Sequence, residues 1–313
     1  MDKTGFTAYL ESKDLAVKTI FTHVKYVEHF FAQVKKEDIQ VTKPDVLKFL
    51  EYLKNTKKLT NSHRCYYLRS LKHYFGFLHH HQQIVKNPCS LLKIRGTRKK
   101  MLYKIYTSEE LDRLFDNYHQ FFVRNFDSRH IPVNRREHTV LSRERNAAML
   151  SILIYQGTTT GEIERIETDD LDLMKATVTI RDAKRGKGRT LPLKAAQVGL
   201  LIHYLQNIRP QLLEHKATES SKLFLLLPCV NKKKKDSVTD AFYRMSKLLK
   251  TIDKQYKNVL QIRASVITFW IKTLGLRKAQ YMAGHRYINT TENYLPNNLD
   301  DLIDDINKLH PFL

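Results

Sequence analysis

The C-terminal part of the chain contains the stretch MAGHRYINTTENY, which occupies residues 282–294. A helical pattern ends just before His285, and Thr290 or Thr291 can cap a new short helix. That helix would carry Tyr294 and place its phenol one short helix away from the imidazole. Because a phenol is a weak nucleophile at its ordinary pKa of ~10, a reactive tyrosine needs positive groups around it. If cations lie close to this stretch, it predicts a tyrosine that reacts with a phosphate group.

Two earlier segments can supply such cations. Arg263 stands near the start of the apolar helical run at residues 262–271, and its guanidinium can bind two phosphate oxygens at once. Lys184 lies in the sequence AKRGKGRTLPL at residues 183–193, which is typical of two strands joined by a turn. Lys187 is an alternative lysine within the same turn.

These segments together resemble the tyrosine recombinases, also called the phage integrase family. The signature of that family is Gly-His, a short polar run, Thr-Thr, two residues and then Tyr. The resemblance covers nearly the whole chain and implies that Tyr294 is the nucleophile and that Arg263 and His285 bind the scissile phosphate. When the hairpin is aligned on Leu191-Pro192-Leu193, the resemblance implies that Lys184 protonates the leaving 5′ oxygen. The overall pattern is similar to recombinases of Bacteroidetes-type mobile elements.

Two positions depart from the family pattern. Thr159 stands where the family has its first arginine, and Leu260 stands where it has a histidine or lysine three residues before Arg263. Loss of one phosphate-binding arginine ordinarily lowers a rate by ~10²–10³-fold. Either another cation has taken over the role or the chain is slow or inactive. The sequence offers four candidates for such a replacement: Arg165, Arg185, Arg189 and Arg286.

The composition indicates an anionic partner. The chain has 313 residues, with 54 Lys and Arg against 32 Asp and Glu, which gives a formal net charge of +22. Double-stranded DNA is the expected partner, and no membrane association is expected, because no long apolar run or lipidation signal is present. Cys65, Cys89 and Cys229 show no metal-binding spacing. We expect no metal and no cofactor, and a cytoplasmic, DNA-associated protein of a bacterium.

The predicted fold is mainly α with a small antiparallel β-sheet. Residues 1–95 show only helical periodicity and are expected to form a core-binding, DNA-binding domain. Residues 96–106 are expected to form a basic linker, and residues 107–313 a catalytic domain that ends in an assembly helix. The cations expected to contact DNA are Arg64, Arg69, Lys72, Arg95, Arg98, Lys99 and Lys100.

Within the second domain, a buried helix is expected at residues 142–156 and strands at residues 176–180 and 189–193. The polar segment at residues 126–138 is expected to be an extended loop. The amphipathic tail from residue 297 has acidic and apolar sides. The resemblance implies that it couples neighbouring protomers, and a helix that closes its own domain is the alternative.

The function implied by the resemblance is site-specific recombination through a 3′-phosphotyrosyl intermediate, without metal or ATP. The expected assembly is a homotetramer on DNA and a monomer or dimer when free. Thr159 and Leu260 leave open a catalytically lapsed DNA-binding relative. A type IB topoisomerase shares the chemistry, and a metal-dependent nuclease is disfavoured by the lack of a ligand set.

Overall fold

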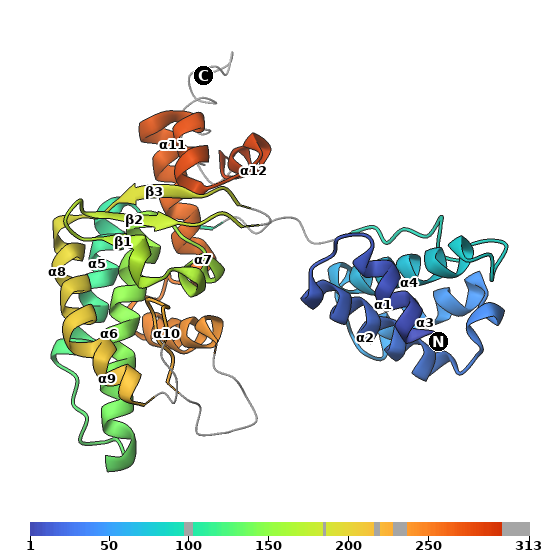
Figure 1. Cartoon of the computed structure of the whole chain (residues 1–313), viewed down its shortest axis with the longest axis horizontal. Coiled ribbons are helices and arrows are strands. Elements are labelled where there is room, and N and C mark those ends of the chain that lie inside the picture. The colour runs from blue at the N-terminus through green and yellow to red at the C-terminus, as the bar shows by residue number, and fades with distance from the viewer. Residues whose placement is uncertain (97–102, 184–185, 216–219, 228–236, 296–313) are drawn as a thin grey trace, which may run out of the picture. The chain divides into compact units, whose positions relative to one another are not determined.

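The computed structural model describes residues 1–96, 103–183, 186–215, 220–227 and 237–295. The chain divides into two compact units, an N-terminal unit, Met1–Met101, and a C-terminal unit, Leu102–Leu313 (Figure 1). Each unit has its own hydrophobic core. The prediction of a mainly helical fold with a small antiparallel sheet is confirmed. The predicted boundaries at 95 and 107, and the roles given to the two parts, stay predictions.

The N-terminal unit is a bundle of four helices. Its elements are α1 (Lys3–Glu11), α2 (Val17–Val34), the 3₁₀ helix η1 (Asp38–Gln40), α3 (Lys43–Asn55) and α4 (Asn61–His80). Along α2, buried Ile20, Val24, Val27 and Phe30 recur at helical spacing and form one apolar face. That face packs against α4, whose aromatic residues fill much of the core.

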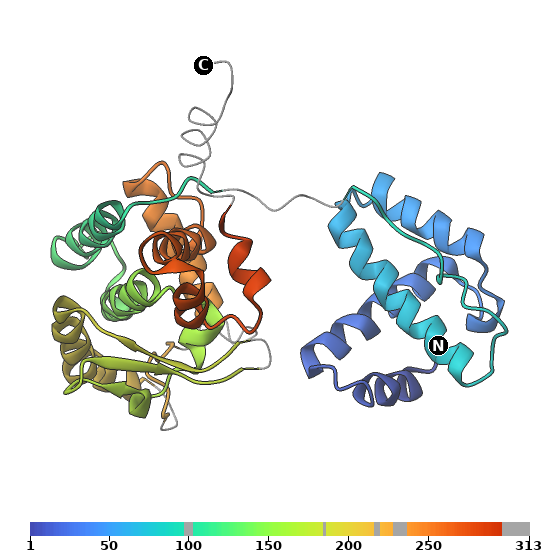
Figure 2. The same ribbon diagram turned by 90° about the horizontal axis from the view of Figure 1, so that it is seen from above.

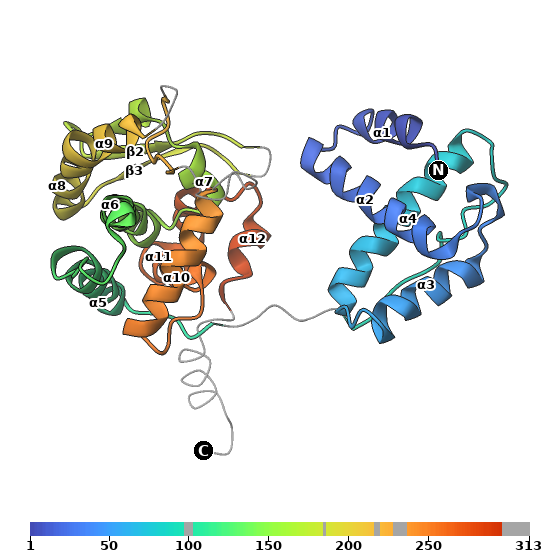
Figure 3. The ribbon, with the colours of Figure 1, turned by 90° about the horizontal axis from the view of Figure 1, so that it is seen from below.

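The C-terminal unit is built around one long helix. The helices of this unit are α5 (Ser108–His119), the π-helix η2 (Gln120–Arg124), α6 (Val133–Gln156), α7 (Thr160–Arg165), the 3₁₀ helix η3 (Thr168–Asp170), α8 (Ala195–His203), the π-helix η4 (Tyr204–Ile208), α9 (Arg209–Glu214), α10 (Val238–Ile252), α11 (Val259–Ala283) and α12 (Ile288–Glu292). Residues 145–154 of α6 are all buried. The helix contacts α5, α8 and α11, and Figure 3 shows it surrounded by these neighbours.

A three-stranded antiparallel sheet lies along one side of the C-terminal unit (Figure 2). The strands are β1 (Leu171–Asp172), β2 (Thr177–Ile180) and β3 (Arg189–Pro192), in the order β1-β2-β3. In β3 the buried residues alternate with exposed ones, so Arg189 faces the interior together with Leu191. A charged side chain thus occupies a core-facing position.

Helix α11 carries the first part of the site. Its N-cap residue is Asn258, whose side chain accepts a hydrogen bond from the backbone N–H of Gln261. By length and composition α11 could cross a membrane, but half of its apolar window is buried inside the protein, and core helices of soluble proteins pass the same test. The helix is interrupted at Gly275, which adopts a φ of 78°. It continues to Ala283 and ends at Gly284 in the left-handed conformation.

The segment that enters the C-terminal unit is fastened to the first turns of α11. The Gln261 Nε2 atom donates to the carbonyl of Lys104 at 3.0 Å, and the backbone N–H of Tyr106 donates to Ser265 Oγ at 2.9 Å. The Asn258 side chain reaches the hydroxyl of Tyr103 at 3.4 Å. Residues 103–106 are therefore anchored to α11 before α5 begins.

The expected loop at residues 126–138 is partly wrong, and one strand was not expected. Residues 126–138 were expected to be an extended loop, but α6 begins at Val133, so only the first part of this segment is irregular. The sheet also has a third strand, β1, which the sequence did not indicate because two residues are too few for an alternating pattern.

Candidate functional site

Arg263, His285 and Tyr294 come together where α11 meets α12. Arg263 lies in the second turn of α11 and is only 6% exposed, while His285 follows the end of the same helix. Tyr294 follows α12 and packs at the edge of the core. Helices α11 and α12 contact each other directly (Figure 3). Three of the four residues predicted to be catalytic are thus brought into one cluster.

The Arg263 guanidinium links the ends of two helices. Its Nη1 donates to the carbonyl of Gly157 at the end of α6, and its Nη2 donates to the carbonyl of Ala283 at 2.9 Å. The guanidinium also hydrogen-bonds the side chain of Tyr294. Burial lowers the pKa of Arg263, whereas the charge of Glu162 and the contact with Tyr294 raise it. A positive group therefore lies against the phenol, where it would stabilise a phenolate.

The hydrogen bonds of His285 indicate which ring nitrogen carries the proton. Its Nε2 lies 3.2 Å from Arg263 Nη2, and its Nδ1 lies 2.9 Å from Thr291 Oγ1. Because a guanidinium only donates, Nε2 is the acceptor, and the ring proton of the neutral imidazole is on Nδ1. The ring stacks on that of Tyr294 with centroids 5.7 Å apart. The imidazole is thus held between the cation and the phenol.

The Thr-Thr pair has a different role from the one expected. Thr290 and Thr291 were expected to cap the short helix, but the N-cap residue of α12 is Tyr287, and both threonines lie inside the helix. Thr291 is fully buried, and its hydroxyl orients His285. The Thr-Thr motif therefore orients the His285 imidazole through Thr291 and does not cap the helix.

Glu162 lies beside Arg263 and holds a second arginine. Its Oε1 accepts from Arg189 Nη1 at 2.7 Å, and its Oε2 lies 3.6 Å from Arg263 Nη1. Burial by itself raises the pKa of Glu162, but the hydrogen bond from Arg189 and the charges of both arginines lower it to about 2. The carboxylate is therefore ionised between two buried cations.

Thr159, at the position of the missing arginine, is the N-cap residue of α7. Its backbone N–H donates to Glu162 Oε2 at 2.7 Å, and its hydroxyl exchanges hydrogen bonds with the same residue in a capping box. Leu260, at the other departure, is 62% exposed on the first turn of α11. Neither position places a cation near Tyr294.

Among the candidate replacements, Arg189 alone belongs to the cluster within the part of the chain that the structure describes. Its side chain has no exposed surface, and its Nε and Nη2 atoms have no hydrogen-bond partner there. Leaving buried donors unpaired costs about 1–3 kcal/mol each. Arg165 and Arg286 are exposed, and Arg185 lies outside the described residues.

The β2–β3 turn meets the loop of His285. Gly186 forms an isolated bridge with His285, and the backbone N–H of Lys187 donates to the carbonyl of Gly284 at 3.0 Å. Lys184 itself lies outside the described residues, so its role as general acid stays a prediction. The side chain of Lys187 is exposed.

The predicted DNA-contacting cations that the structure describes fall into two groups. Arg69 and Arg95 are exposed, and the Arg69 guanidinium stands over the ring of Tyr66 at 5.8 Å. Arg64 and Lys72 are half-buried and donate to the carbonyls of Leu50 and Ser90 at 3.0 and 3.1 Å. The remaining predicted cations, Arg98, Lys99 and Lys100, lie outside the described residues, as does the tail beyond residue 295.

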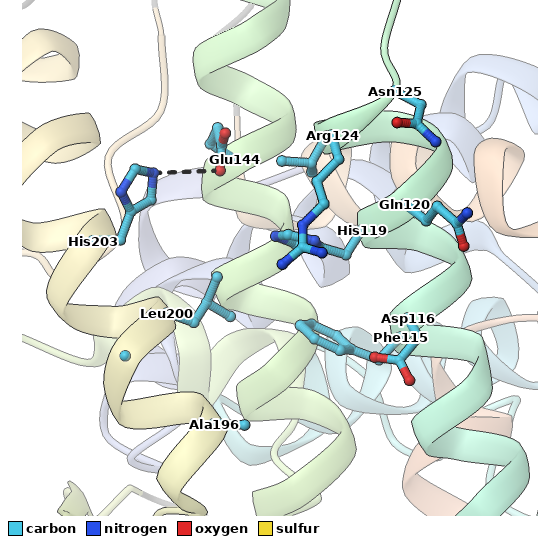
Figure 4. Close-up of a pocket in the computed structure, with 12 residues that line it drawn as sticks. Phe115, Asp116, His119, Gln120, Arg124, Asn125, Glu144, Ala196, Leu200 and His203 are labelled. Carbon is cyan, nitrogen blue, oxygen red and sulfur yellow. Dashed lines mark ion pairs between the residues drawn. The ribbon is translucent and has the colours of Figure 1, made fainter.

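A separate pocket of about 920 Å³ opens between α5, η2, α6 and α8 (Figure 4). Its polar lining mixes both signs of charge, with Glu144 3.8 Å from His203 and Arg124 nearby. It shares no residue with the cluster around Tyr294. Within the described ranges, no group of three or more His, Cys, Asp or Glu side chains is placed to hold a metal ion.

Comparison with known families identifies the chain. The model of the phage integrase family matches residues 134–300, which is more than half of the 313 residues. The chain belongs to the phage integrase family. A second model, for the SAM-like N-terminal domain of phage integrases, matches residues 4–82 of this family member. The predicted relationship to tyrosine recombinases is confirmed, and the Bacteroidetes sub-family stays a prediction.

Individual relatives agree with the family assignment. The tyrosine recombinase XerD of Staphylococcus aureus is 30% identical to this phage integrase over 170 residues, which cover 53% of this chain and 55% of XerD. The matched region therefore spans about half the length of that relative.

Solved structures show the same fold. XerH recombinase in a post-cleavage complex with its palindromic difH substrate has a TM-score of 0.62 and 17% identity, and the match covers 95% of this chain and 81% of XerH. The Tn1549 transposon integrase in complex with transposon right end DNA has a TM-score of 0.60 and 14% identity, with 98% and 99% covered. At these identities the likeness concerns the fold alone.

Proposed function

We propose that the chain is a site-specific DNA recombinase that cuts and rejoins strands through a covalent link to Tyr294. The observation that carries this proposal is the packing of the phenol against the Arg263 guanidinium and the His285 ring. A phenol held by a buried cation and an oriented imidazole is suited to attack a phosphodiester.

In the proposed reaction, Tyr294 Oη releases its proton to solvent and forms a bond to the scissile phosphorus. The bond from phosphorus to the 5′ oxygen breaks, and that oxygen takes up a proton, which the family resemblance assigns to Lys184. The products are a 3′-phosphotyrosyl link and a free 5′ hydroxyl. Attack by the 5′ hydroxyl of a partner strand reverses these steps and restores the phenol, so no external energy source is required.

Arg263 and His285 would act on the phosphate oxygens. A bound phosphate would compete with His285 Nε2 and the two backbone carbonyls for the N–H groups of Arg263. Once Arg263 turns to the phosphate, it would neutralise charge that develops on the pentacoordinate phosphorus. The imidazole would become a donor to the phosphate after it gains a proton at Nε2.

The proposed substrate is double-stranded DNA, which fits the formal net charge of +22 and the exposed Arg69 and Arg95. XerH and the Tn1549 integrase were solved on DNA, which supports the same partner here. We propose four copies acting together on two sites, in the cytoplasm of a bacterium.

The test is a suicide substrate, a nicked duplex that carries the end of the mobile element encoding the chain. Wild type and Tyr294→Phe are incubated with it without divalent metal, and a denaturant-resistant protein–DNA band is measured. Wild type should form the band and Tyr294→Phe should not. Tyr287→Phe is the matched control, because Tyr287 is 69% exposed and precedes the same helix.

Two results would overturn the proposal. An adduct in Tyr294→Phe would place the nucleophile elsewhere. No adduct in wild type, on a duplex that it binds, would favour the lapsed DNA-binding relative that Thr159 and Leu260 left open. Relaxation of a supercoiled plasmid without the site would instead favour a topoisomerase.

A further inference from the structure

Arg189 is a buried arginine whose hydrogen-bonding groups are only partly paired. It occupies a core-facing position of β3, and its side chain has no exposed surface. Its Nη1 donates to Glu162, whereas its Nε and Nη2 find no partner among the described residues. Buried polar groups without partners are rare in folded proteins, and those that persist need an explanation.

The charges around Glu162 do not balance. Arg189 and Arg263 both lie against this one carboxylate, which leaves one formal positive charge in the interior. A buried excess charge is unfavourable unless an opposite charge joins it. A phosphodiester at Tyr294 would bring that negative charge, because Arg263 contacts both Glu162 and the phenol.

We propose that Arg189 is a positioning residue that compensates for the arginine missing at position 159. It acts through Glu162, which it holds beside Arg263, and it adds a second buried positive charge to the site that receives the scissile phosphate. This inference rests on the proposed phosphotyrosine mechanism and names the residue that makes the mechanism possible without the first arginine.

The surroundings of the guanidinium support this role. Gly284 is in the left-handed region with φ of 67°, and a side chain there would collide with the Arg189 guanidinium. Gly284 immediately precedes His285, so Arg189 also packs beneath the loop that carries the imidazole. Thr159 binds the other oxygen of Glu162 through its backbone and hydroxyl. The Glu162 carboxylate thus contacts both Thr159, where the family has its first arginine, and Arg189, the residue proposed to compensate for it.

The first experiment compares adduct formation by wild type, Arg189→Gln and Arg189→Lys on the nicked phosphodiester duplex. Arg189→Gln should be slower by ~10²–10³-fold, the usual effect of losing one charge-stabilising group. Arg189→Lys keeps the charge and should stay within about tenfold of wild type. The matched control is Arg181→Gln, because Arg181 lies beside the same hairpin and pairs with Asp170 and Glu167 but is 48% exposed.

The second experiment separates charge from structure. A methylphosphonate at the scissile position replaces one non-bridging oxygen by a methyl group and removes the negative charge of the phosphate. If Arg189 supplies compensating charge, the gap between wild type and Arg189→Gln should shrink at least tenfold on this neutral substrate. A merely structural defect would leave the gap unchanged.

Equal gaps on both substrates, or a lysine variant as slow as the glutamine variant, would overturn the proposal. Thermal unfolding and DNA binding are measured for each variant. If Arg189→Gln does not fold, the double variant Arg189→Gln/Glu162→Gln, which removes both charges of the pair, is compared with Glu162→Gln alone, so that the two proteins differ only in the charge of Arg189. Failure of wild type to form any adduct on bound DNA would instead refute the proposed function.

Discussion

The two units differ in what they bury. Among the residues that the structure describes, the N-terminal unit buries only two polar side chains, the neutral pair His23 and Ser70, inside a largely aromatic core. The C-terminal unit buries five charged side chains: Arg145, Glu162, Asp170, Arg189 and Arg263. Three of these five form one connected cluster, in which Arg263 contacts Tyr294 and Glu162 lies between Arg263 and Arg189.

If the chain binds DNA as proposed, this difference gives it two ways of using cations. Exposed arginines of the N-terminal unit keep their hydration and can meet phosphates anywhere along a backbone. Buried arginines of the C-terminal unit have lost their hydration, which strengthens their effect on charge that develops nearby. We therefore expect the exposed arginines to contribute to DNA affinity, and the buried arginines near Tyr294 to contribute to the proposed reaction.

The largest expected effect comes from removing a buried cation. Arg263→Ala should lower the rate of adduct formation by about 10³-fold while DNA affinity changes little, because the side chain contacts the phenol and, in the proposed mechanism, binds the phosphate. Single-turnover cleavage and filter binding measure the two quantities. The matched control is Arg277→Ala, an exposed arginine on the same helix. A rate within tenfold of wild type would contradict the idea that buried cations of the C-terminal unit contribute mainly to the reaction.

The next effect is a pH dependence of the unfolding free energy of the C-terminal unit. The pKa of Glu162 is about 2 in the folded state, below its ordinary value of 4.5, so the ionised carboxylate stabilises the fold above pH ~4.5. This contribution, roughly 3 kcal/mol, should be lost as the pH falls from 4.5 to 2. Denaturant unfolding followed by fluorescence measures it selectively, since the single tryptophan, Trp270, packs against Gly157.

Glu162→Gln is the control for that measurement. It removes the titrating group, so its unfolding free energy should change less between pH 4.5 and 2 than that of wild type. Parallel curves for the two proteins would show that the buried carboxylate does not govern the acid stability of this unit.

A smaller effect of the same kind is expected in the N-terminal unit. The Ser70 hydroxyl donates to Tyr66, so it accepts from Nδ1–H of His23, and burial lowers the pKa of this imidazole to about 4. Because the unfolded state takes up the proton first, stability should fall from pH 6.5 to 4 by roughly 2 kcal/mol after allowance for solvent screening.

Circular dichroism during denaturant unfolding measures this change, with Trp270 fluorescence as the record of the other unit. His23→Gln should flatten the pH dependence, whereas His79→Gln, at an exposed position of α4, should leave it as in wild type. If the loss of stability between pH 6.5 and 4 instead appears in the Trp270 fluorescence, the pH-sensitive group lies in the C-terminal unit and the prediction for His23 is wrong.

The smallest effect concerns a single exposed cation. Arg69→Ala should weaken DNA binding a few-fold and reduce the salt dependence of the binding constant by about one phosphate contact, a slope change of ~0.9. Arg64→Ala should lower stability more than affinity, because Arg64 donates to Leu50 and Asn61 within the protein. Binding titrations at several salt concentrations distinguish the two, and an unchanged slope for Arg69→Ala would remove it from the interface.

Much of this architecture could be predicted from local sequence. Helical periodicity located α2, and strict alternation located β2 and β3, because burial on one face imposes the pattern directly. The short spacing between His285 and Tyr294 allowed their proximity to be expected. The polar start of α6 was missed because its first two turns lack a continuous apolar face.

The partner of Glu162 was harder to predict, because it depends on a contact between residues 27 positions apart. The sequence offered four candidate arginines, and only packing distinguishes them. One signal was available: Arg189 is two residues before Leu191, so strand alternation places both on the same buried face. The orienting role of Thr291 depends on the path of the chain after Gly284, which no local pattern specifies.

The attachment of residues 103–106 to α11 has a mechanical consequence. Tension applied to residues 103–106 would be transmitted through Lys104 and Tyr106 to Gln261 and Ser265, which lie two residues before and after Arg263 in the helix. A pull on residues 103–106 would therefore reach the turn of α11 that carries Arg263 before it reaches α5.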